Sequence, residues 1–255
     1  MLSYPGSLDL STQTLTALTR LLSRHRAQIN SPGRKLTPHR QALCVLVHLR
    51  QGHPQRQLAH SFGVSLTTIW RYLHEAITLL AAAAPTRDEA LATYARHRRA
   101  PLLLDGTLIT TRAQPGARHY YSGNHRRYGV NIQVLTDLRG HPIWISPTLP
   151  GSTNDLTAAR THGILTAAAH QGLTLLADKG YQGAGHTTCT PHRTPRTKTL
   201  TPEQHHTNRT HTRLRAPVER AHATLKTWRI LHHLHYPPHH LTPLIQAIHT
   251  LHTTP

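Results

Sequence analysis

The sequence predicts an α/β protein in which a small all-helical domain precedes a larger domain built on a mixed sheet. Before residue 85, apolar residues recur at helical spacing, beginning in the segment 11–24. Beyond residue 100 the pattern changes to alternation, as in Val130, Ile132 and Val134, which is typical of a half-buried strand. The predicted domains are a helical domain at residues 1–85, a linker helix at 86–100 and a sheet domain at 101–255.

Three helical segments account for the first domain. Leucines recur at helical spacing in residues 11–24, and residues 38–49 are apolar nearly all round, as expected of a helix buried among others. The stretch 54–73 resembles a helix-turn-helix. Gly63 can adopt the positive φ of a tight helix-ending turn, and Ser65 can cap the helix that follows.

The second helix of this motif predicts a face for nucleic acid. Ile69 and Leu73 lie four residues apart and are expected on the buried side. The residues predicted to face a DNA groove or phosphate are Thr67, Thr68, Trp70 and Arg71. The alternative is a module of packed helices that only docks on the second domain.

The charge balance favours nucleic acid as the partner. Lys and Arg total 29 against 10 Asp and Glu, a formal net charge of +19 over 255 residues. Such a chain is expected to bind phosphate backbone in a strongly salt-dependent way. No apolar run approaches the ~20 residues of a membrane span, and the start lacks a signal pattern. We therefore expect an intracellular protein with no membrane partner.

Cysteine and histidine give little support to a soft-metal site. Cys44 and Cys189 are far apart and belong to no Cys-x-x-Cys pair, so neither a disulfide framework nor a thiolate zinc site is indicated. The 25 histidines are scattered through a chain also rich in Thr, Pro and Arg. We interpret them as compositional bias and solvated surface, with histidine-based metal binding as the alternative.

The second domain is expected to alternate strands and helices. Asp88–Arg98 is predicted to be a connecting helix, because Asp88 and Glu89 suit the positive end of its dipole. Residues 183–213 are polar and are expected to form an extended loop, mobile until DNA is present. The remaining predicted elements are strands at 101–111, 128–136, 143–149 and 173–177, a hairpin turn at 137–140, and helices at 156–169, 215–234 and 241–251.

Three of the scarce acids stand in distinctive settings. Asp105 follows three leucines, Asp178 follows a short apolar run, and Glu219 begins a late helix. A charge at the edge of a core is costly unless it meets a cation, so we predict that these carboxylates bind metal. The alternative for both aspartates is a turn, and Glu219 could instead complement its helix dipole.

The order of strands and helices resembles an RNase H-like domain, and the residues around the acids extend the resemblance. Asp178 is followed by Lys179, Gly180 and Tyr181, while Arg215, Glu219 and Lys226 give the pattern Arg-x3-Glu-x6-Lys. With Asp105 as the first acid, the chain resembles the DDE transposases of bacterial insertion sequences, in the IS-four and IS-five type grouping related to Harbinger elements. Thr212 stands where that signature usually has Tyr.

The resemblance implies an activity and its partners. Asp105, Asp178 and Glu219 would hold two Mg²⁺ or Mn²⁺ ions for strand cleavage at the element ends and strand transfer into target DNA. Arg215, Lys226 and Lys179 would bind phosphate or orient the acids. The expected partners are double-stranded DNA and further copies of the chain, in the bacterial cytoplasm at the nucleoid.

Two rival functions and three further acids stay open. A non-catalytic helix-turn-helix regulator explains the charge but gives the three acids no task, and a stand-alone RNase H-like nuclease is the other option. Asn154 or Asp155 is expected to cap the helix that follows. For Asp155, capping or support of the ligands from behind is favoured over direct ligation, and it is the replacement ligand if Asp178 proves remote from Asp105. Asp137 and Glu203 are expected to be solvated.

Overall fold

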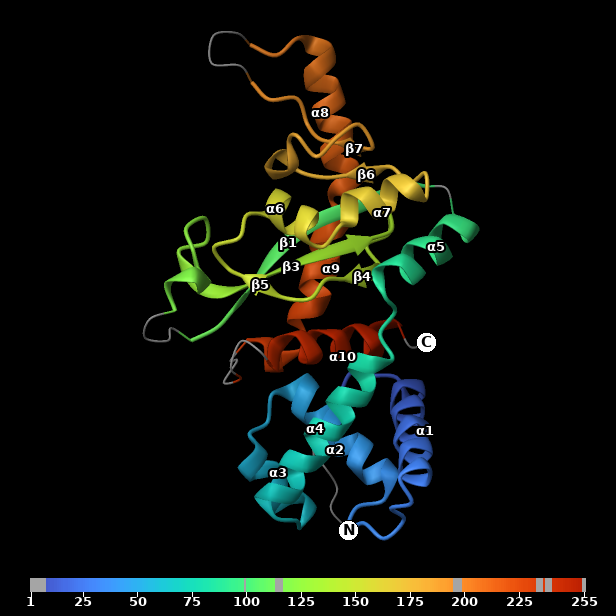
Figure 1. Cartoon of the computed structure of the whole chain (residues 1–255). Helices are drawn as coiled ribbons and strands as arrows, with labels where there is room; N and C mark the ends of the chain where they lie inside the picture. The colour runs from blue at the N-terminus through green and yellow to red at the C-terminus, as the bar shows by residue number, and fades with distance from the viewer. Residues whose placement is uncertain are drawn as a thin grey trace. The chain divides into compact units, whose positions relative to one another are not determined.

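The structure is a computed structural model that describes residues 8–98, 100–112, 117–194, 199–232, 236 and 240–253. The chain divides into a helical unit, formed by residues 1–84 together with 226–255, and a sheet unit formed by residues 85–225 (Figure 1). The C-terminal segment of the predicted sheet domain therefore packs with the first helices. The predicted linker helix packs with the sheet.

Short hydroxyl caps begin the helices of the helical unit. Ser11 and Thr37 accept hydrogen bonds from the third residue of α1 and α2, which satisfies a backbone donor that the helix itself leaves unpaired. Thr250 of α10 donates to the carbonyl of Leu80 at 2.8 Å and so ties α10 to α4. The helices are α1 (Thr12–Gln28), α2 (Pro38–Gln51), α3 (Gln55–Phe62), α4 (Leu66–Ala82) and α10 (Leu241–Thr253), with a 3₁₀ turn η3 (Arg229–Leu231).

The predicted helix-turn-helix is present as α3 and α4. Gly63 ends α3 with a φ of +66°, and the Ser65 hydroxyl accepts from the amide of Thr68 at 3.2 Å. Ile69 and Leu73 are buried, at 0% and 2% exposure. Because a left-handed residue and a cap are set by local chemistry alone, both could be read from the sequence.

A buried carboxylate joins α1, α2 and α4. Glu75 of α4 accepts from the Arg34 guanidinium at 2.6 Å and from the Gln41 amide at 2.8 Å, and lies 3.2 Å from a ring nitrogen of His25. Burial raises the pKa of Glu75, but the bonds from Arg34 and Gln41 outweigh it and hold this pKa below its usual value. Glu75 is therefore a structural anion within the helical unit.

A mixed sheet forms the centre of the sheet unit, as predicted. The strand order is β2-β3-β1-β6-β7, with β4 and β5 also paired to β3. β1 runs antiparallel to β3 and parallel to β6. The strands are β1 (Leu102–Thr110), β2 (Tyr121–Ser122), β3 (Arg127–Thr136), β4 (Pro142–Ile145), β5 (Leu149–Pro150), β6 (Leu175–Leu176) and β7 (Thr188–Cys189).

Alternating residues of β1 bury both faces of this sheet. Leu102 and Leu104 belong to a core cluster with side chains of α5 (Arg87–His97), α6 (Asp155–Thr161) and α7 (Ile164–His170). Leu103 faces the opposite way and packs against Val218 of α9 (Pro217–Lys226). The sheet thus has helices on both faces (Figure 1), which is why β1 reads as a continuous apolar run.

Two predicted helices are shorter than expected. The segment 156–169 is divided into α6 and α7 by Gly163, whose φ of +61° interrupts the helix. In the predicted helix 215–234, α9 ends at Lys226 and η3 follows, while residues 233 and 234 lie outside the described residues. In both segments the apolar residues keep a spacing of 3.6 residues past the point where the helix ends, so the spacing alone could not show that the helix is interrupted.

The expectation of an extended loop over 183–213 was wrong. This segment contains β7 and α8 (Pro202–Arg215), with residues 195–198 outside the described residues. Thr201 and Gln204 form a reciprocal capping box, and Pro202 occupies the first turn. These local signals begin a helix that buries little, since His211 is its buried residue.

The expectation that Asp137 is solvated was also wrong, because its side chain is buried with 4% exposure. One carboxylate oxygen accepts from the amides of Arg139 and His141 at 2.9 Å each, and the other lies 3.3 Å from Arg98. Asp137 therefore closes the predicted hairpin turn at 137–140 from within. Glu203, by contrast, is exposed in the first turn of α8.

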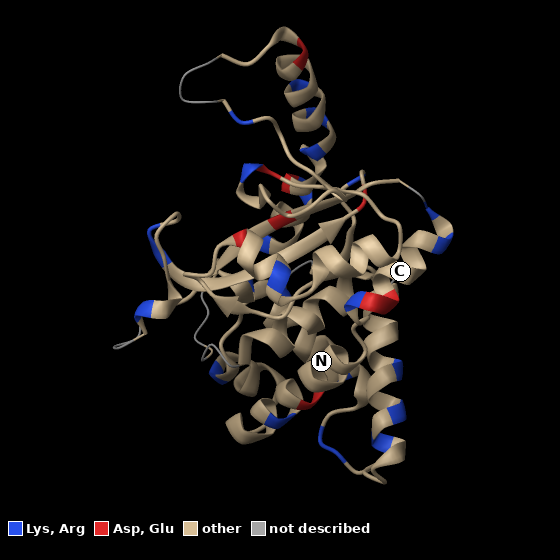
Figure 2. Ribbon diagram, turned by 45° about the horizontal axis from the view of Figure 1, so that its top comes forward, with Lys and Arg blue, Asp and Glu red and all other residues tan. Residues whose placement is uncertain are grey.

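Basic residues greatly outnumber acidic residues in this chain. Lys and Arg occur along both units, while Asp and Glu occupy few positions (Figure 2). Within the part of the chain that the structure describes, none of the helices combines the length and apolar character needed to cross a bilayer. A carboxylate in this chain is rare enough that its surroundings need explanation, and several lie together in the sheet unit.

Candidate active site

The sheet places Asp105 and Asp178 at the same level of neighbouring strands. β1 and β6 are parallel, with Leu103 paired to Leu176. Two residues further along each chain stand Asp105 and Asp178. Asp105 is within β1 and its side chain is 16% exposed, whereas Asp178 follows the end of β6 and is half-buried. Parallel strand ends thus bring two acids from distant parts of the sequence to one edge.

Asp178 is also a turn residue, as its alternative interpretation predicted. Its Oδ1 accepts from the amide of Gly180 at 2.8 Å and caps the 3₁₀ turn η2 (Lys179–Tyr181). Lys179 is exposed on this turn, while the Tyr181 side chain is fully buried. The short motif after Asp178 therefore has an identifiable structural task, because it sends Tyr181 into the core beneath the acids.

Asp105 is the electrostatic centre of the group. Its pKa is raised to about 7, first by burial and then by the negative charges of Asp178, Asp155 and Glu219. The Arg215 guanidinium acts in the opposite direction. Glu219 is exposed in the first turn of α9, yet its charge still reaches Asp105. Four carboxylates of a strongly basic chain therefore act on one another here.

Arg215 holds the oxygen of Asp105 that a metal ion would need. Its Nη2 donates to Asp105 Oδ1 at 3.0 Å, and both side chains are only 16% exposed. The Arg215 Nε is buried without a hydrogen-bond partner among the described residues. His222 of α9 approaches the second oxygen, with its Nδ1 3.8 Å from Asp105 Oδ2. In this arrangement Arg215 is a charge partner of Asp105.

Asp155 faces the sheet and leaves helix capping to its neighbour. Asn154 is the N-cap of α6 and accepts from the amide of Thr157 at 2.8 Å. The Asp155 Oδ1 instead accepts from the side-chain amides of Asn131 at 2.8 Å and Gln133 at 3.2 Å. Of the two expected capping residues, Asn154 has that role, so the Asp155 carboxylate is directed toward β3.

A buried amide network connects Asp155 to Tyr181. The Tyr181 hydroxyl donates to Gln133 Oε1 at 2.6 Å, and Gln133 Nε2 donates to Asn131 Oδ1 at 2.9 Å. Asn131 and Gln133 are 7% and 0% exposed. Sequence reasoning took them as the polar face of a strand and missed this role. The feature of the sequence that could have indicated this network is the pair of amide side chains two residues apart, Asn131 and Gln133, in a predicted strand.

Gly106 makes room for the Asp155 carboxylate. A Cβ at this position would lie 1.9 Å from Asp155 Oδ1 and 2.9 Å from Gln133 Nε2. No side chain larger than hydrogen therefore fits between β1 and Asp155 without moving one of them. The glycine after Asp105 allows close approach of a second carboxylate. The turn that was the alternative interpretation of Asp105 is absent, because β1 continues to Thr110.

These acids suit a hard divalent cation by donor type, since carboxylate oxygens are the ligands that Mg²⁺ and Mn²⁺ prefer. Burial first, and the charges of the neighbouring acids after it, raise the pKa of Asp105, and a bound cation would oppose both effects. Among the described residues, however, no three His, Cys, Asp or Glu side chains are arranged closely enough to hold an ion. Ligation of an ion by three of these acids would therefore require their side chains to move closer together.

The predicted DNA-facing residues of α4 lie at the surface of the helical unit. Trp70 is 53% exposed and stacks on His74, with ring centroids 5.2 Å apart and planes 7° apart. Thr67 and Arg71 are exposed and Thr68 is half-buried. Lys226, which was expected to bind phosphate or to orient the acids, is the last residue of α9 and lines a cavity in the helical unit.

The helix-turn-helix and the mixed sheet with its acids agree with the class of DDE endonucleases. Residues 104–253 match the family model "DDE superfamily endonuclease", and residues 34–86 match "Helix-turn-helix of DDE superfamily endonuclease". The chain belongs to this family. The first match begins beside Asp105 and extends past Glu219, and the second contains α3 and α4.

Two curated relatives are proteins of insertion sequences. The chain is 34% identical over 229 residues to the "Putative transposase for insertion sequence element IS112" of Streptomyces albus G. It is 24% identical over 231 residues to the "Probable transposase for insertion sequence element IS702" of Microchaete diplosiphon. Each alignment covers 87% of this chain and 82% of the relative. No solved structure matches the chain.

Proposed function

We propose that this protein is the transposase of an insertion sequence, which binds the ends of its element, cleaves DNA there and joins the released strand to target DNA. The observation that supports the chemistry is the action of Asp178, Asp155 and Glu219 on the pKa of Asp105. In a chain with 29 basic and 10 acidic residues, Asp105 and Asp178 follow paired residues of two parallel strands, and the charges of three acids reach Asp105. Such a gathering is unfavourable unless a cation is a regular part of the site.

Asp105, Asp178 and Glu219 would hold two Mg²⁺ or Mn²⁺ ions, with Asp155 as the replacement ligand. When bound, these ions activate the oxygen that attacks phosphorus and neutralise the oxygen that leaves. Asp105 must be ionised to serve, so its proton has to be lost first. Because Arg215 already favours the ionised form, it prepares Asp105 for this task.

Cations of the chain would position the DNA. Lys179 is exposed on η2, one residue after Asp178, and can reach a phosphate near the acids. The Arg215 guanidinium can donate through two nitrogens, and one of them donates to Asp105. It can therefore bind a phosphate as well as the carboxylate. On the helical unit, α4 would enter a groove with Thr67, Thr68 and Arg71, which lie outside the cavity that Trp70 lines. A homo-oligomer on DNA belongs to the same proposal.

The test is cleavage and strand transfer on DNA that carries the element's own ends, with Mg²⁺ or Mn²⁺. Asp105→Asn, Asp178→Asn and Glu219→Gln each remove one charge and keep the shape of the side chain. We expect each variant to bind the ends like wild type and to cut them slower by a factor on the order of a hundred or more. Asp88→Asn, in an exposed acid of α5 paired with Arg87, is the matched control and should cut normally.

The outcomes separate the rival functions. A non-catalytic regulator would bind the ends with every variant and cut with none, wild type included. A stand-alone nuclease would cut DNA without preference for the ends and without strand transfer. If Asp178→Asn cuts normally while Asp155→Asn does not, Asp155 is the ligand and the assignment of Asp178 fails.

A further inference from the structure

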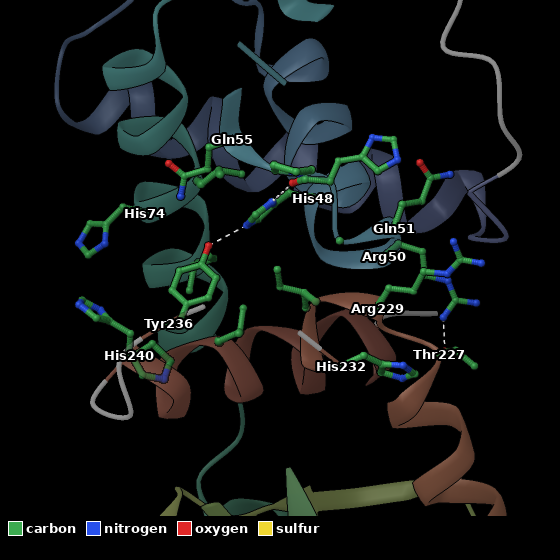
Figure 3. A pocket seen from close by; sticks show the side chains of 18 of the residues that line it. His48, Arg50, Gln51, Gln55, His74, Thr227, Arg229, His232, Tyr236 and His240 are labelled. Carbon is green, nitrogen blue, oxygen red and sulfur yellow. Dashed lines mark hydrogen bonds between the residues drawn. The ribbon is translucent and has the colours of Figure 1, made fainter. Parts of the chain in front are cut away.

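A large basic cavity lies within the helical unit and has no task in the proposed reaction. Its volume is about 1290 Å³, which exceeds the 300–1,000 Å³ typical of small-molecule sites. The end of α2, the first part of α4 and the chain around η3 and α10 provide its walls. Figure 3 shows its labelled side chains, which differ in kind from one end to the other.

One end of the cavity carries cations. Arg50 and Arg229 lie together there beside Thr227 (Figure 3), and Lys226 also lines the cavity. Of the described lining residues, Asp9 is the sole acid, and it pairs with Arg50 at 2.8 Å. Burial first and the charge of Arg229 second lower the pKa of His53. The potential at this end is therefore positive and favours an anion.

The other end presents aromatic and imidazole rings. His74, Tyr236 and His240 lie there in Figure 3, and Trp70 lines the cavity next to His74. Trp70 and His74 are stacked with nearly parallel planes, and Trp70 keeps 53% of its surface exposed. A further flat ring could be added to this stack at no cost in unstacking, as in proteins that bind bases on aromatic platforms.

Tyr236 is held in place across the cavity. His48 Nδ1 donates to the carbonyl of His53 at 2.7 Å, which fixes the neutral tautomer with Nε2 as acceptor. The Tyr236 hydroxyl donates to that Nε2 at 2.7 Å. Burial lowers the pKa of His48 and so maintains the neutral form. One wall of the cavity is therefore preorganised, because the hydrogen bond to His48 holds the Tyr236 ring at the aromatic end.

We propose that this cavity binds a short stretch of unpaired DNA, with phosphates on Arg229 and Lys226 and a base on the stack of Trp70 and His74. Phosphate alone would need only the cationic end. In a duplex the faces of the bases are covered by their neighbours, so a free ring stack favours unpaired nucleotides over double-stranded DNA. This site goes beyond the binding of double-stranded element ends by α4 and does not depend on cleavage.

The test uses the full chain and oligothymidylate, a single strand that does not pair with itself. Trp144 and Trp228 are 5% and 1% exposed, so quenching of tryptophan fluorescence by the oligonucleotide reports on Trp70. We expect clear quenching by oligothymidylate and little by the same strand paired with oligoadenylate. Trp70→Phe should remove the quenching while anisotropy of a labelled strand still shows binding.

Two arginine variants distinguish this site from the helix-turn-helix. Arg229→Ala should weaken binding of oligothymidylate about tenfold and reduce its salt dependence by about 0.7 in the log–log slope, the contribution of one phosphate on a single strand. It should leave the affinity for double-stranded element ends unchanged, which also shows that the variant is folded. Arg71 is an exposed residue of α4 outside the cavity. Arg71→Ala should weaken the binding of double-stranded element ends and leave the affinity for oligothymidylate unchanged.

The proposal is overturned if Arg229→Ala binds oligothymidylate as wild type does, or if duplex DNA quenches Trp70 as strongly as the single strand. Failure of the proposed transposase function gives a different result. In that case element ends are neither preferred nor cut, while the effect of Arg229→Ala on the single strand is still measured independently.

Discussion

Gly106→Ala tests whether the close approach of Asp155 to β1 holds the candidate site together. The new methyl group would lie 1.9 Å from Asp155 Oδ1 and 2.5 Å from its Cγ, so the carboxylate must move. Its movement breaks the bonds from Asn131 at 2.8 Å and Gln133 at 3.2 Å. Each hydrogen bond to a charged group contributes about 1.5–3 kcal/mol. Alanine in a strand regains about 0.5–1 kcal/mol over glycine.

The expected result is a loss of about 2–4 kcal/mol in the free energy of unfolding, since the displaced carboxylate also regains water. Urea unfolding measures the loss, and hydrogen exchange of β1 and β3 peptides locates it in the sheet unit. Gly123→Ala is the control within the same unit, because nothing lies within 4 Å of its added Cβ. It should change stability by less than about 0.5 kcal/mol.

A double-mutant cycle makes the test specific. In an Asp155→Ala background the clash with the carboxylate is gone, and the remaining close atom is the mobile end of Gln133 at 2.9 Å. Gly106→Ala should then cost less than about 1 kcal/mol, a coupling of roughly 2 kcal/mol between the two positions. An equal cost in both backgrounds, or a stabilised single mutant, would refute the role given to Gly106.

Three further predictions follow from named contacts. Tyr181→Phe leaves the buried Gln133 Oε1 without its donor, so we expect unfolding to become easier by about 1–3 kcal/mol in urea titration, and an unchanged midpoint would contradict the network. Asp137→Ala removes the acceptor of two backbone amides and should cost about 2–4 kcal/mol, against less than about 0.5 kcal/mol for the exposed Glu203→Ala. The pKa of Glu75 is lower in the folded than in the unfolded protein, so its ionised carboxylate contributes fully to stability above the unfolded pKa of about 4.5, and this contribution is lost as the pH falls through the folded pKa. The free energy of unfolding should therefore fall more steeply on acidification in wild type than in Glu75→Gln. Parallel pH profiles of the two proteins would contradict this.

Features set by neighbours in sequence could be predicted, and features set by distant packing could not. The turn at Gly63, the cap at Ser65 and the short apolar strand before Asp178 follow from local chemistry. The amide network did not, because it depends on the pairing of β3 and on α6 lying over it. Nor could the sequence show that α10 packs on α4, since its apolar face fits any buried surface.

The missed helix α8 shows the limit of reasoning from apolar content. Residues 183–213 were expected to be unstructured because they offer little to bury, and α8 indeed buries His211 alone among its described residues. The residues of its capping box, Thr201 and Gln204, were visible in the sequence, but the polar composition of the segment favoured the prediction of a loop. Capping supplies about 1 kcal/mol, so an exposed helix of this kind depends on its ends and on its continuation into α9.

The position of Arg215 explains how a group of acids can persist in the sheet unit at all. Asp105 is buried among the charges of Asp178, Asp155 and Glu219, each of which disfavours its ionised form. Arg215 opposes them through one hydrogen bond of 3.0 Å to Asp105 Oδ1. A cation of the chain thus stands beside the oxygen at which a divalent ion would act. Because α8 ends at Arg215 and α9 begins at Pro217, the break between these helices sets the place of both Arg215 and Glu219.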